Sequence, residues 1–126
     1  MSTDAGTTVG DLRAAVAAFV DARDWRPFHS PKNLAMSIAI EAAEILELFQ
    51  WLDNDQAWAA GDDPATRAAL AEELADVLIY CLSLSNALDL DLSEAVLSKL
   101  QLNEIRYPAD EFRGRYRRPE RDKGGS

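Results

Sequence analysis

Two pairs of acidic residues stand where they could bind a metal ion. Glu41 and Glu44 are three residues apart, and Glu73 and Asp76 repeat that spacing further along the chain. Residues three apart lie side by side on one face of an α-helix. Two such helices packed together would place four carboxylates in one pocket, where protons or cations must offset their repulsion. Hard oxygen ligands in this number suit Mg²⁺, with Mn²⁺ as a substitute.

The acids occupy helix positions where apolar side chains are expected. At about 100° per residue, Glu41 falls within the apolar stripe of residues 34–52. Glu73 stands at one edge of a second stripe, over residues 70–88. An unpaired carboxylate is costly to bury, so each of these positions requires a compensating charge.

Two alternatives to a magnesium site can be weighed from the sequence. In the first, the acids form buried ion pairs, but Arg67 is the only basic residue between Lys32 and Lys99. In the second, the acids hold a di-iron centre, which normally needs two Glu-x-x-His pairs. The chain has a single histidine, His29, outside the predicted helices. The carboxylates therefore favour a site for a hard divalent cation.

Other residues suit a phosphorylated aromatic ligand. Lys99, Asn103 and Arg106 recur at helical spacing and form either a phosphate-binding stripe or a solvated face. The aromatic residues could stack on a nucleobase or pack in a core or subunit interface; these are Trp25, Phe28, Trp51 and Tyr80.

Four helices would position these residues, over about 9–23, 31–52, 64–88 and 92–106. Helix-start signals precede them, at Thr8, Ser30-Pro31, Asp63-Pro64 and Asp91. The sequence predicts an all-α fold, a four-helix bundle, in one domain over residues 1–108. Residues 109–126 are predicted to form a flexible, arginine-rich tail. Two of the helices are apolar around much of their circumference, which predicts a homo-oligomer.

Composition limits the partners and the compartment. The chain has 126 residues and a net charge of −9; residues 1–108 hold 7 lysines and arginines against 18 aspartates and glutamates. Such an acidic body argues against binding a nucleic acid polymer. One cysteine, no apolar run of about 20 residues and no signal peptide predict a cytoplasmic protein that does not enter membranes.

The two carboxylate pairs resemble a known family. Glu41-Ala-Ala-Glu44 and Glu73-Leu-Ala-Asp76 resemble the E-x-x-E and E-x-x-D motifs of the all-α nucleoside triphosphate pyrophosphohydrolases, the MazG-like superfamily. The resemblance covers residues 9–108 and is greatest to the dCTP pyrophosphatase branch. Further matching segments are Arg23-Asp24-Trp25, Phe28-His29-Ser30-Pro31-Lys32-Asn33-Leu34, Glu47-Leu48-Phe49-Gln50-Trp51, Glu72–Tyr80, Leu97-Ser98-Lys99, Asn103 and Arg106-Tyr107-Pro108.

The resemblance implies Mg²⁺-dependent hydrolysis of a deoxynucleoside triphosphate, dCTP or a modified dCTP such as 5-methyl-dCTP, to the monophosphate and pyrophosphate. It implies a role in cleaning the nucleotide pool, and a homotetramer built as a dimer of dimers. Glu41, Glu44, Glu73 and Asp76 would form the catalytic metal site. The base would meet Trp25, Phe28, His29, Trp51 and Tyr80, while Lys99 and Asn103 would contact phosphate or sugar.

Two other functions stay open at the level of sequence. A sister enzyme with dUTP or broad base preference would differ only in the shape of its pocket. A non-enzymatic helical interaction module would use the acids in ion pairs alone. Arg26-Pro27 departs from the pattern of the dCTP branch, so the shape of the base pocket is not predicted.

Overall fold

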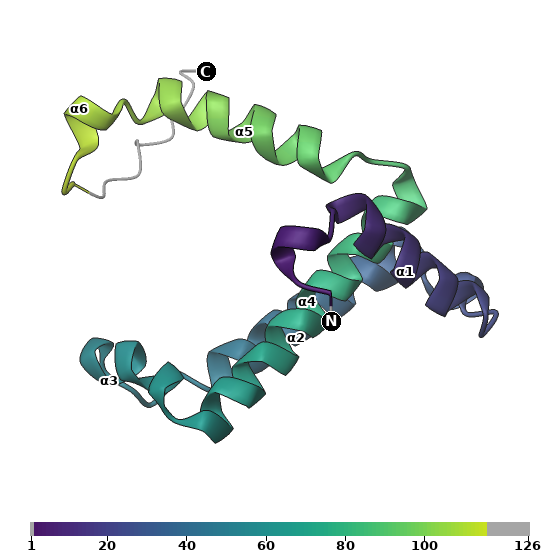
Figure 1. Ribbon diagram of the computed structural model, residues 1–126, viewed down its shortest axis with the longest axis horizontal. Helices are drawn as coiled ribbons and strands as arrows, with labels where there is room; N and C mark the ends of the chain where they lie inside the picture. Colours follow the sequence, from purple (N-terminus) through teal and green to yellow (C-terminus); the bar gives the residue numbers. More distant parts are fainter. Residues whose placement is uncertain (1, 116–126) are drawn as a thin grey trace, which may run out of the picture. The chain divides into compact units, whose positions relative to one another are not determined.

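The computed structural model describes residues 2–115, and every regular element in this part of the chain is a helix (Figure 1). This confirms the predicted all-α class. The α-helices are α1 (Val9–Asp21), α2 (Pro31–Glu47), α3 (Asn54–Ala59), α4 (Pro64–Leu88), α5 (Leu92–Arg106) and α6 (Ala109–Phe112). Three short 3₁₀ helices are η1 (Asp4–Gly6), η2 (Arg26–Phe28) and η3 (Ala60–Asp62).

The chain divides into two compact units. The first ends at Leu90 and contains α1 to α4, with both α1 and α2 packed against the long helix α4 (Figure 1). The second begins at Asp91 and contains α5 and α6. Three of the four long helices predicted for the bundle therefore lie in the first unit and one in the second. The domain limit at residue 108 stays a prediction.

The predicted helix starts are confirmed by hydrogen bonds to the caps. Thr8 and Asp11 form a reciprocal capping box at α1, and the Ser30 hydroxyl accepts from Asn33 N–H at 3.2 Å. Asp63 accepts from Thr66 N–H at 3.0 Å, and Asp91 accepts from Glu94 N–H at 2.9 Å. These bonds satisfy amides that have no partner within the helix. Local sequence thus fixes where each long helix begins.

Two helices end earlier than their patterns predict. The first ends at Asp21 rather than Arg23, because Asp24 turns the backbone to a φ of 51°. The second ends at Glu47 rather than Leu52, because i→i+3 bonds such as Leu48 N–H to Ile45 C=O tighten its last turn.

Two regions that the sequence predicts to lack secondary structure contain short helices. A capping box between Asp53 and Gln56 starts α3 inside the loop predicted over residues 53–63. The predicted tail begins with α6. Residues 116–126 of that tail lie outside the described residues.

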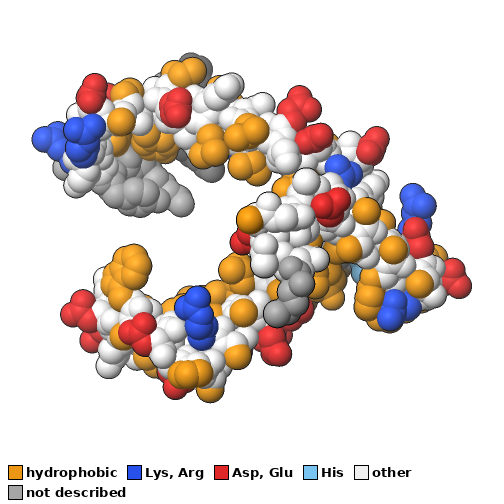
Figure 2. All heavy atoms as spheres, in the orientation of Figure 1, with side chains coloured by type: hydrophobic (Ala, Val, Ile, Leu, Met, Phe, Trp, Pro, Cys, Tyr) orange, Lys and Arg blue, Asp and Glu red, His pale blue; other side chains and the backbone are white. Residues whose placement is uncertain are grey.

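The core of the first unit is small. Leu34 of α2 and Leu82 of α4 are its buried apolar residues, at 1% and 6% exposure. Hydrophobic side chains are visible at the surface of both units (Figure 2). On α2 and α4, for example, Ile40 is 60% exposed and Leu78 is 52% exposed. No helix within residues 2–115 has the length and apolar character that crossing a bilayer requires.

Candidate functional site

The packing of α2 against α4 brings the predicted acids together. Carboxylate oxygens of Glu41, Glu73 and Asp76 all lie within 4.8 Å of one another. Glu44, one turn after Glu41, contacts both Glu41 and Glu73 through its carboxylate. The neighbouring acids Glu47 and Glu72 are exposed, whereas Glu41, Glu44 and Glu73 are half-buried. We call Glu41, Glu44, Glu73 and Asp76 the acidic cluster.

Mutual repulsion within the acidic cluster changes its protonation. A hydrogen bond donated by protonated Glu73 to the Glu44 carboxylate, helped by desolvation and the other negative charges, raises the pKa of Glu73 to about 7. Desolvation, followed by the hydrogen bond to Glu44 and the charges of Glu44 and Asp76, raises the pKa of Glu41 above its ordinary value. The folded chain therefore holds these groups in a site that disfavours their ionised forms.

The donor set of the acidic cluster fits a hard divalent cation. Oε2 of Glu41 and Oε2 of Glu73 are buried and have no hydrogen-bond partner among residues 2–115. The one ion pair among residues 2–115 joins Arg113 to Asp110, so no basic side chain of this part of the chain neutralises the cluster. Mg²⁺ and Mn²⁺ prefer oxygen ligands of this type, and either cation would supply the missing positive charge.

A series of aromatic rings lies beside the acidic cluster. Tyr80 follows Asp76 by one turn of α4, and its ring stacks on His29 with 6.4 Å between centroids and 22° between planes. His29 stacks in turn on Trp25, at 6.3 Å and 9°. The edge of Phe19 meets Trp25 at 5.7 Å. These four rings, the aromatic series, join residues from α1, the η2 region and α4.

Local backbone geometry positions the aromatic series. The positive φ of Asp24 reverses the chain after α1, so Trp25 N–H donates to Val20 C=O at 3.1 Å. The Arg23 guanidinium lies 3.6 Å above the centroid of the Phe19 ring, and Arg23 Nη1 donates to Phe19 C=O at 3.0 Å. These contacts hold Phe19 and Trp25, at one end of the aromatic series, against the last turn of α1.

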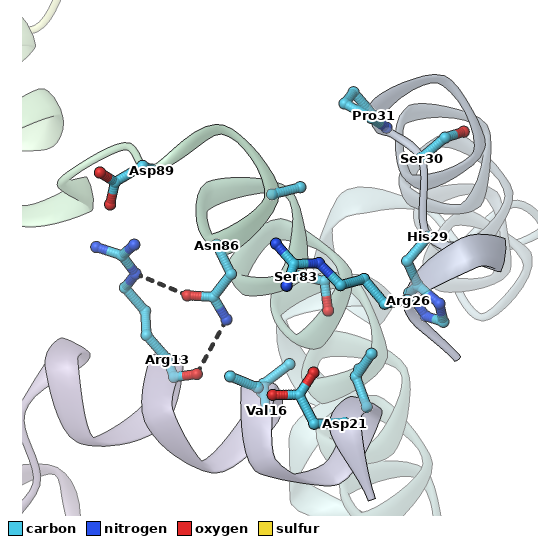
Figure 3. A pocket seen from close by; sticks show the side chains of 13 residues that line it. Arg13, Val16, Asp21, Arg26, His29, Ser30, Pro31, Ser83, Asn86 and Asp89 are labelled. Atoms are coloured by element: carbon cyan, nitrogen blue, oxygen red, sulfur yellow. Dashed lines mark hydrogen bonds between the residues drawn. The ribbon is translucent and has the colours of Figure 1, made fainter. Parts of the chain in front are cut away.

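A cavity of about 510 Å³ opens between α1, α4 and the start of α2 (Figure 3). Arg13 and Asn86 bridge α1 and α4 at one side: Arg13 Nε donates to Asn86 Oδ1 at 3.1 Å, and Asn86 Nδ2 donates to Arg13 C=O at 3.0 Å. Arg26 extends toward Ser83 in the same view, and His29 contributes to the wall. The volume lies in the range of small-molecule sites.

The structure gathers part of the predicted binding set. Trp25, His29 and Tyr80 come together in the aromatic series. Phe28 and Trp51, 70% and 87% exposed, make no aromatic contact within residues 2–115. On α5, Lys99 is exposed and Asn103 is half-buried, in the second unit. The roles of these four residues stay predictions.

Sequence reasoning missed the residues that join α1 to α4. Arg13 and Asn86 are 73 positions apart and belong to no recognisable motif. The departure at Arg26 was visible in sequence, but its position on the cavity wall was not. Only the close approach of α1 and α4 gives these side chains a shared site.

Comparisons with known proteins identify the family. A sequence model described as the MazG-like family matches residues 36–118. The chain belongs to the MazG-like family. A pyrophosphatase of known crystal structure from Archaeoglobus fulgidus is 41% identical to this MazG-like chain, with a TM-score of 0.73 over 79% of this chain and 91% of the other.

Curated relatives carry a more specific description. This MazG-like chain is 46% identical over 102 residues to dCTP pyrophosphatase 1 of Homo sapiens, covering 81% of this chain and 60% of the relative. It is 43% identical over 107 residues to dCTP pyrophosphatase 1 of Mus musculus, covering 85% of this chain and 63% of the relative. The chain therefore spans about 60% of the length of these relatives.

Proposed function

We propose that this protein hydrolyses a deoxynucleoside triphosphate, dCTP or a modified dCTP such as 5-methyl-dCTP, to the monophosphate and pyrophosphate with Mg²⁺ as cofactor. The observation that carries the proposal is the acidic cluster, with two buried carboxylate oxygens that have no hydrogen-bond partner in the part of the chain that the structure describes. The similarity to dCTP pyrophosphatase 1 and the adjoining aromatic series support a nucleotide as substrate.

Catalysis in this proposal depends on positioning and charge neutralisation. Glu41, Glu44, Glu73 and Asp76 would hold the cation, which neutralises phosphate charge and lowers the pKa of bound water. A water oxygen bonds to the α-phosphorus, and the bond from that phosphorus to the bridging oxygen of the β-phosphate breaks. Pyrophosphate leaves, and a carboxylate of the acidic cluster, Glu41 or Glu44, accepts the proton of the attacking water.

The remaining predicted residues would bind the rest of the substrate. The aromatic series offers faces on which a base stacks, through Trp25, His29 and Tyr80. We propose that Phe28 and Trp51 complete the base pocket and that Lys99 and Asn103 contact phosphate or sugar. The exposure of both Phe28 and Trp51 would allow another subunit to use them.

We also propose a homo-oligomer, a tetramer built as a dimer of dimers. The exposed apolar residues of α2 and α4 support it, because water contact at Ile40 and Leu78 is unfavourable. A cytoplasmic location, and the absence of nucleic acid polymers from the partners, stay predictions from composition.

Pyrophosphate release tests the proposal. The full chain is incubated with dCTP, 5-methyl-dCTP, dUTP, dTTP and the purine deoxynucleoside triphosphates, each with Mg²⁺ and with EDTA. Release that needs Mg²⁺ and is greatest for the cytosine nucleotides is the expected result. Release spread evenly over the bases would support the sister enzyme with broad preference. Silence on every substrate would leave either an unusual nucleotide outside this panel or the non-enzymatic interaction module.

A further inference from the structure

Helix α2 connects the acidic cluster to the aromatic series. It carries Glu41 and Glu44, and the segment that precedes it carries Trp25 and His29. Asn33 is the third residue of α2, and at 1.5 Å per residue it lies about 12 Å from Glu41 along the axis. The separation between the phosphate end and the base end of a bound nucleotide therefore depends on how the preceding segment is held against the first turn of α2.

The side chain of Asn33 links α2 to that segment. Its backbone N–H donates to the Ser30 hydroxyl at 3.2 Å, and its Nδ2 donates to Phe28 C=O at 3.2 Å. In a capping box, the side chain of the third helical residue returns only to the N-cap residue. Here the N-cap is Ser30, and the Asn33 side chain reaches two residues further back, to the last residue of η2. Among residues 2–115 this is the only hydrogen bond between residues 25–29 and α2.

Hydrogen bonds within residues 25–29 make this segment a single unit. Phe28 N–H donates to Trp25 C=O at 2.9 Å, and His29 N–H donates to Arg26 C=O at 3.1 Å. The rings of Trp25 and His29 also stack, with 6.3 Å between their centroids. A hydrogen bond that holds the carbonyl of Phe28 therefore fixes the positions of Trp25 and His29 together.

We propose that Asn33 is a positioning residue, which touches no substrate but holds residues 25–29 at the correct distance from the acidic cluster through its bond to Phe28 C=O. This inference rests on the proposed function. Without the bond, the segment occupies other positions as well, and the apparent affinity for the nucleotide falls by the fraction of molecules in the competent one. The reaction takes place at the acidic cluster, so kcat does not depend on Asn33 once the nucleotide is bound.

Two variants of one residue test this role. N33D keeps the shape of the side chain and places a negative charge where a helix start favours it, but its carboxylate cannot donate to Phe28 C=O. We expect N33D to raise KM for dCTP about 5-fold, with kcat within about 2-fold of the wild type. N33Q retains an amide donor and should raise KM less than N33D does. K32A, on an exposed neighbour in the same turn, should leave both constants unchanged. An unchanged KM in N33D, an equal rise in N33Q, or a fall in kcat as large as the rise in KM would overturn the inference.

A second measurement needs no variant and covers the case in which N33D does not fold. Hydrogen exchange of the full wild-type chain, without nucleotide, should show slow exchange at the amides of Phe28 and His29, because a segment held against α2 opens rarely. Exchange at the rate of an unstructured peptide would show that the segment is not held, and would contradict the role of Asn33. If the wild-type protein hydrolyses no triphosphate with Mg²⁺, the proposed function itself fails. Hydrolysis of dCTP with an unchanged KM in N33D refutes only the inference about Asn33.

Discussion

At the scale of single residues, the acidic cluster differs from ordinary surface acids in burial and in partners. Glu73 is half-buried, with one oxygen that has no hydrogen-bond partner within the described residues 2–115, while its neighbour Glu72 is exposed. The same contrast separates Glu41 from Glu47 on α2. Glu72 and Glu47 carry the same carboxylate outside the acidic cluster. Substitutions of these two residues therefore serve as matched controls for substitutions within the cluster.

Substitution of the cluster should abolish turnover. E41Q and E73Q each remove one charge and one metal-binding carboxylate, and we expect kcat/KM for dCTP to fall at least about 100-fold. E47Q and E72Q should retain activity within about 2-fold, because these side chains lie outside the cluster. The rate of pyrophosphate release from dCTP at saturating Mg²⁺ is compared between the two cluster variants and the two control variants. Comparable loss in the control variants would show that position in the cluster does not matter.

The raised pKa of Glu73 predicts a pH-dependent stability without metal. An acid with a folded pKa of about 7 and an ordinary value of 4.5 binds its proton more tightly in the folded state. Its contribution to stability is complete below pH 4.5 and is lost as the pH rises through 7. In EDTA, the melting temperature should therefore decrease from about pH 5 to about pH 8.

The E73Q variant isolates this effect. Because glutamine does not titrate, E73Q should show a smaller decrease in melting temperature over the same pH interval than the wild type. E72Q should behave like the wild type. An identical pH profile for E73Q and wild type would show that Glu73 does not cause the dependence.

At the scale of helices, α4 determines the geometry of the whole site. It packs against both α1 and α2, and it carries Glu73, Asp76, Tyr80 and Ser83 along one face. The Arg13–Asn86 pair then holds α1 to the end of α4 that lines the cavity. Loss of the Arg13 or the Asn86 side chain should therefore loosen the cavity wall more than it loosens the acidic cluster.

The coupling of Arg13 and Asn86 can be measured. We expect N86A to lower the free energy of unfolding by about 1–3 kcal/mol, because it leaves part-buried polar groups of Arg13 without a partner. A double-mutant cycle with R13A should give a coupling energy above about 0.5 kcal/mol in urea unfolding. Additive effects would show that the two side chains act independently.

Leu34 tests the contribution of α2 to the core. It is 1% exposed, so L34A should leave a cavity and lower the free energy of unfolding by about 2–5 kcal/mol. K32A, on an exposed position of the same helix, should change it by less than about 0.5 kcal/mol. Chemical denaturation followed by circular dichroism compares the two. A small effect of L34A would mean that α2 contributes little to the core.

At the scale of the whole molecule, metal binding and association should both stabilise the fold. A cation that binds only the native state raises the melting temperature as its concentration increases. We expect Mg²⁺ to raise the melting temperature of the wild type and to have a much smaller effect on E73Q. Differential scanning calorimetry with Mg²⁺ and with EDTA tests this. An equal shift in both proteins would place the metal elsewhere.

The exposed apolar residues predict association of several chains. Light scattering coupled to size exclusion should give a mass that is a multiple of 13.9 kDa, with four chains as the expected number. Replacement of Ile40 and Leu78 by lysine should reduce that mass by disrupting the apolar surface. A monomeric wild-type chain at micromolar concentration would refute the oligomer.

The sequence alone determined the all-α class, the helix starts and the two carboxylate pairs. These features depend on interactions between residues close in the chain: Thr8 with Asp11 in a cap, or Glu73 with Asp76 on one face. The periodicity of apolar residues is also enough to separate Glu41, within the apolar stripe, from Glu47, which points away from it. Local spacing was sufficient because a helix repeats every 3.6 residues.

Only the tertiary structure decided which distant residues share a site. The raised pKa of Glu73 requires α2 to pack on α4, and the stacking of His29 on both Trp25 and Tyr80 requires the segment after α1 to lie against α4. The pairing of Arg13 with Asn86 spans 73 positions and leaves no periodic pattern in either helix. Contacts of this kind depend on how whole helices approach one another, which many side chains determine together and no single spacing predicts.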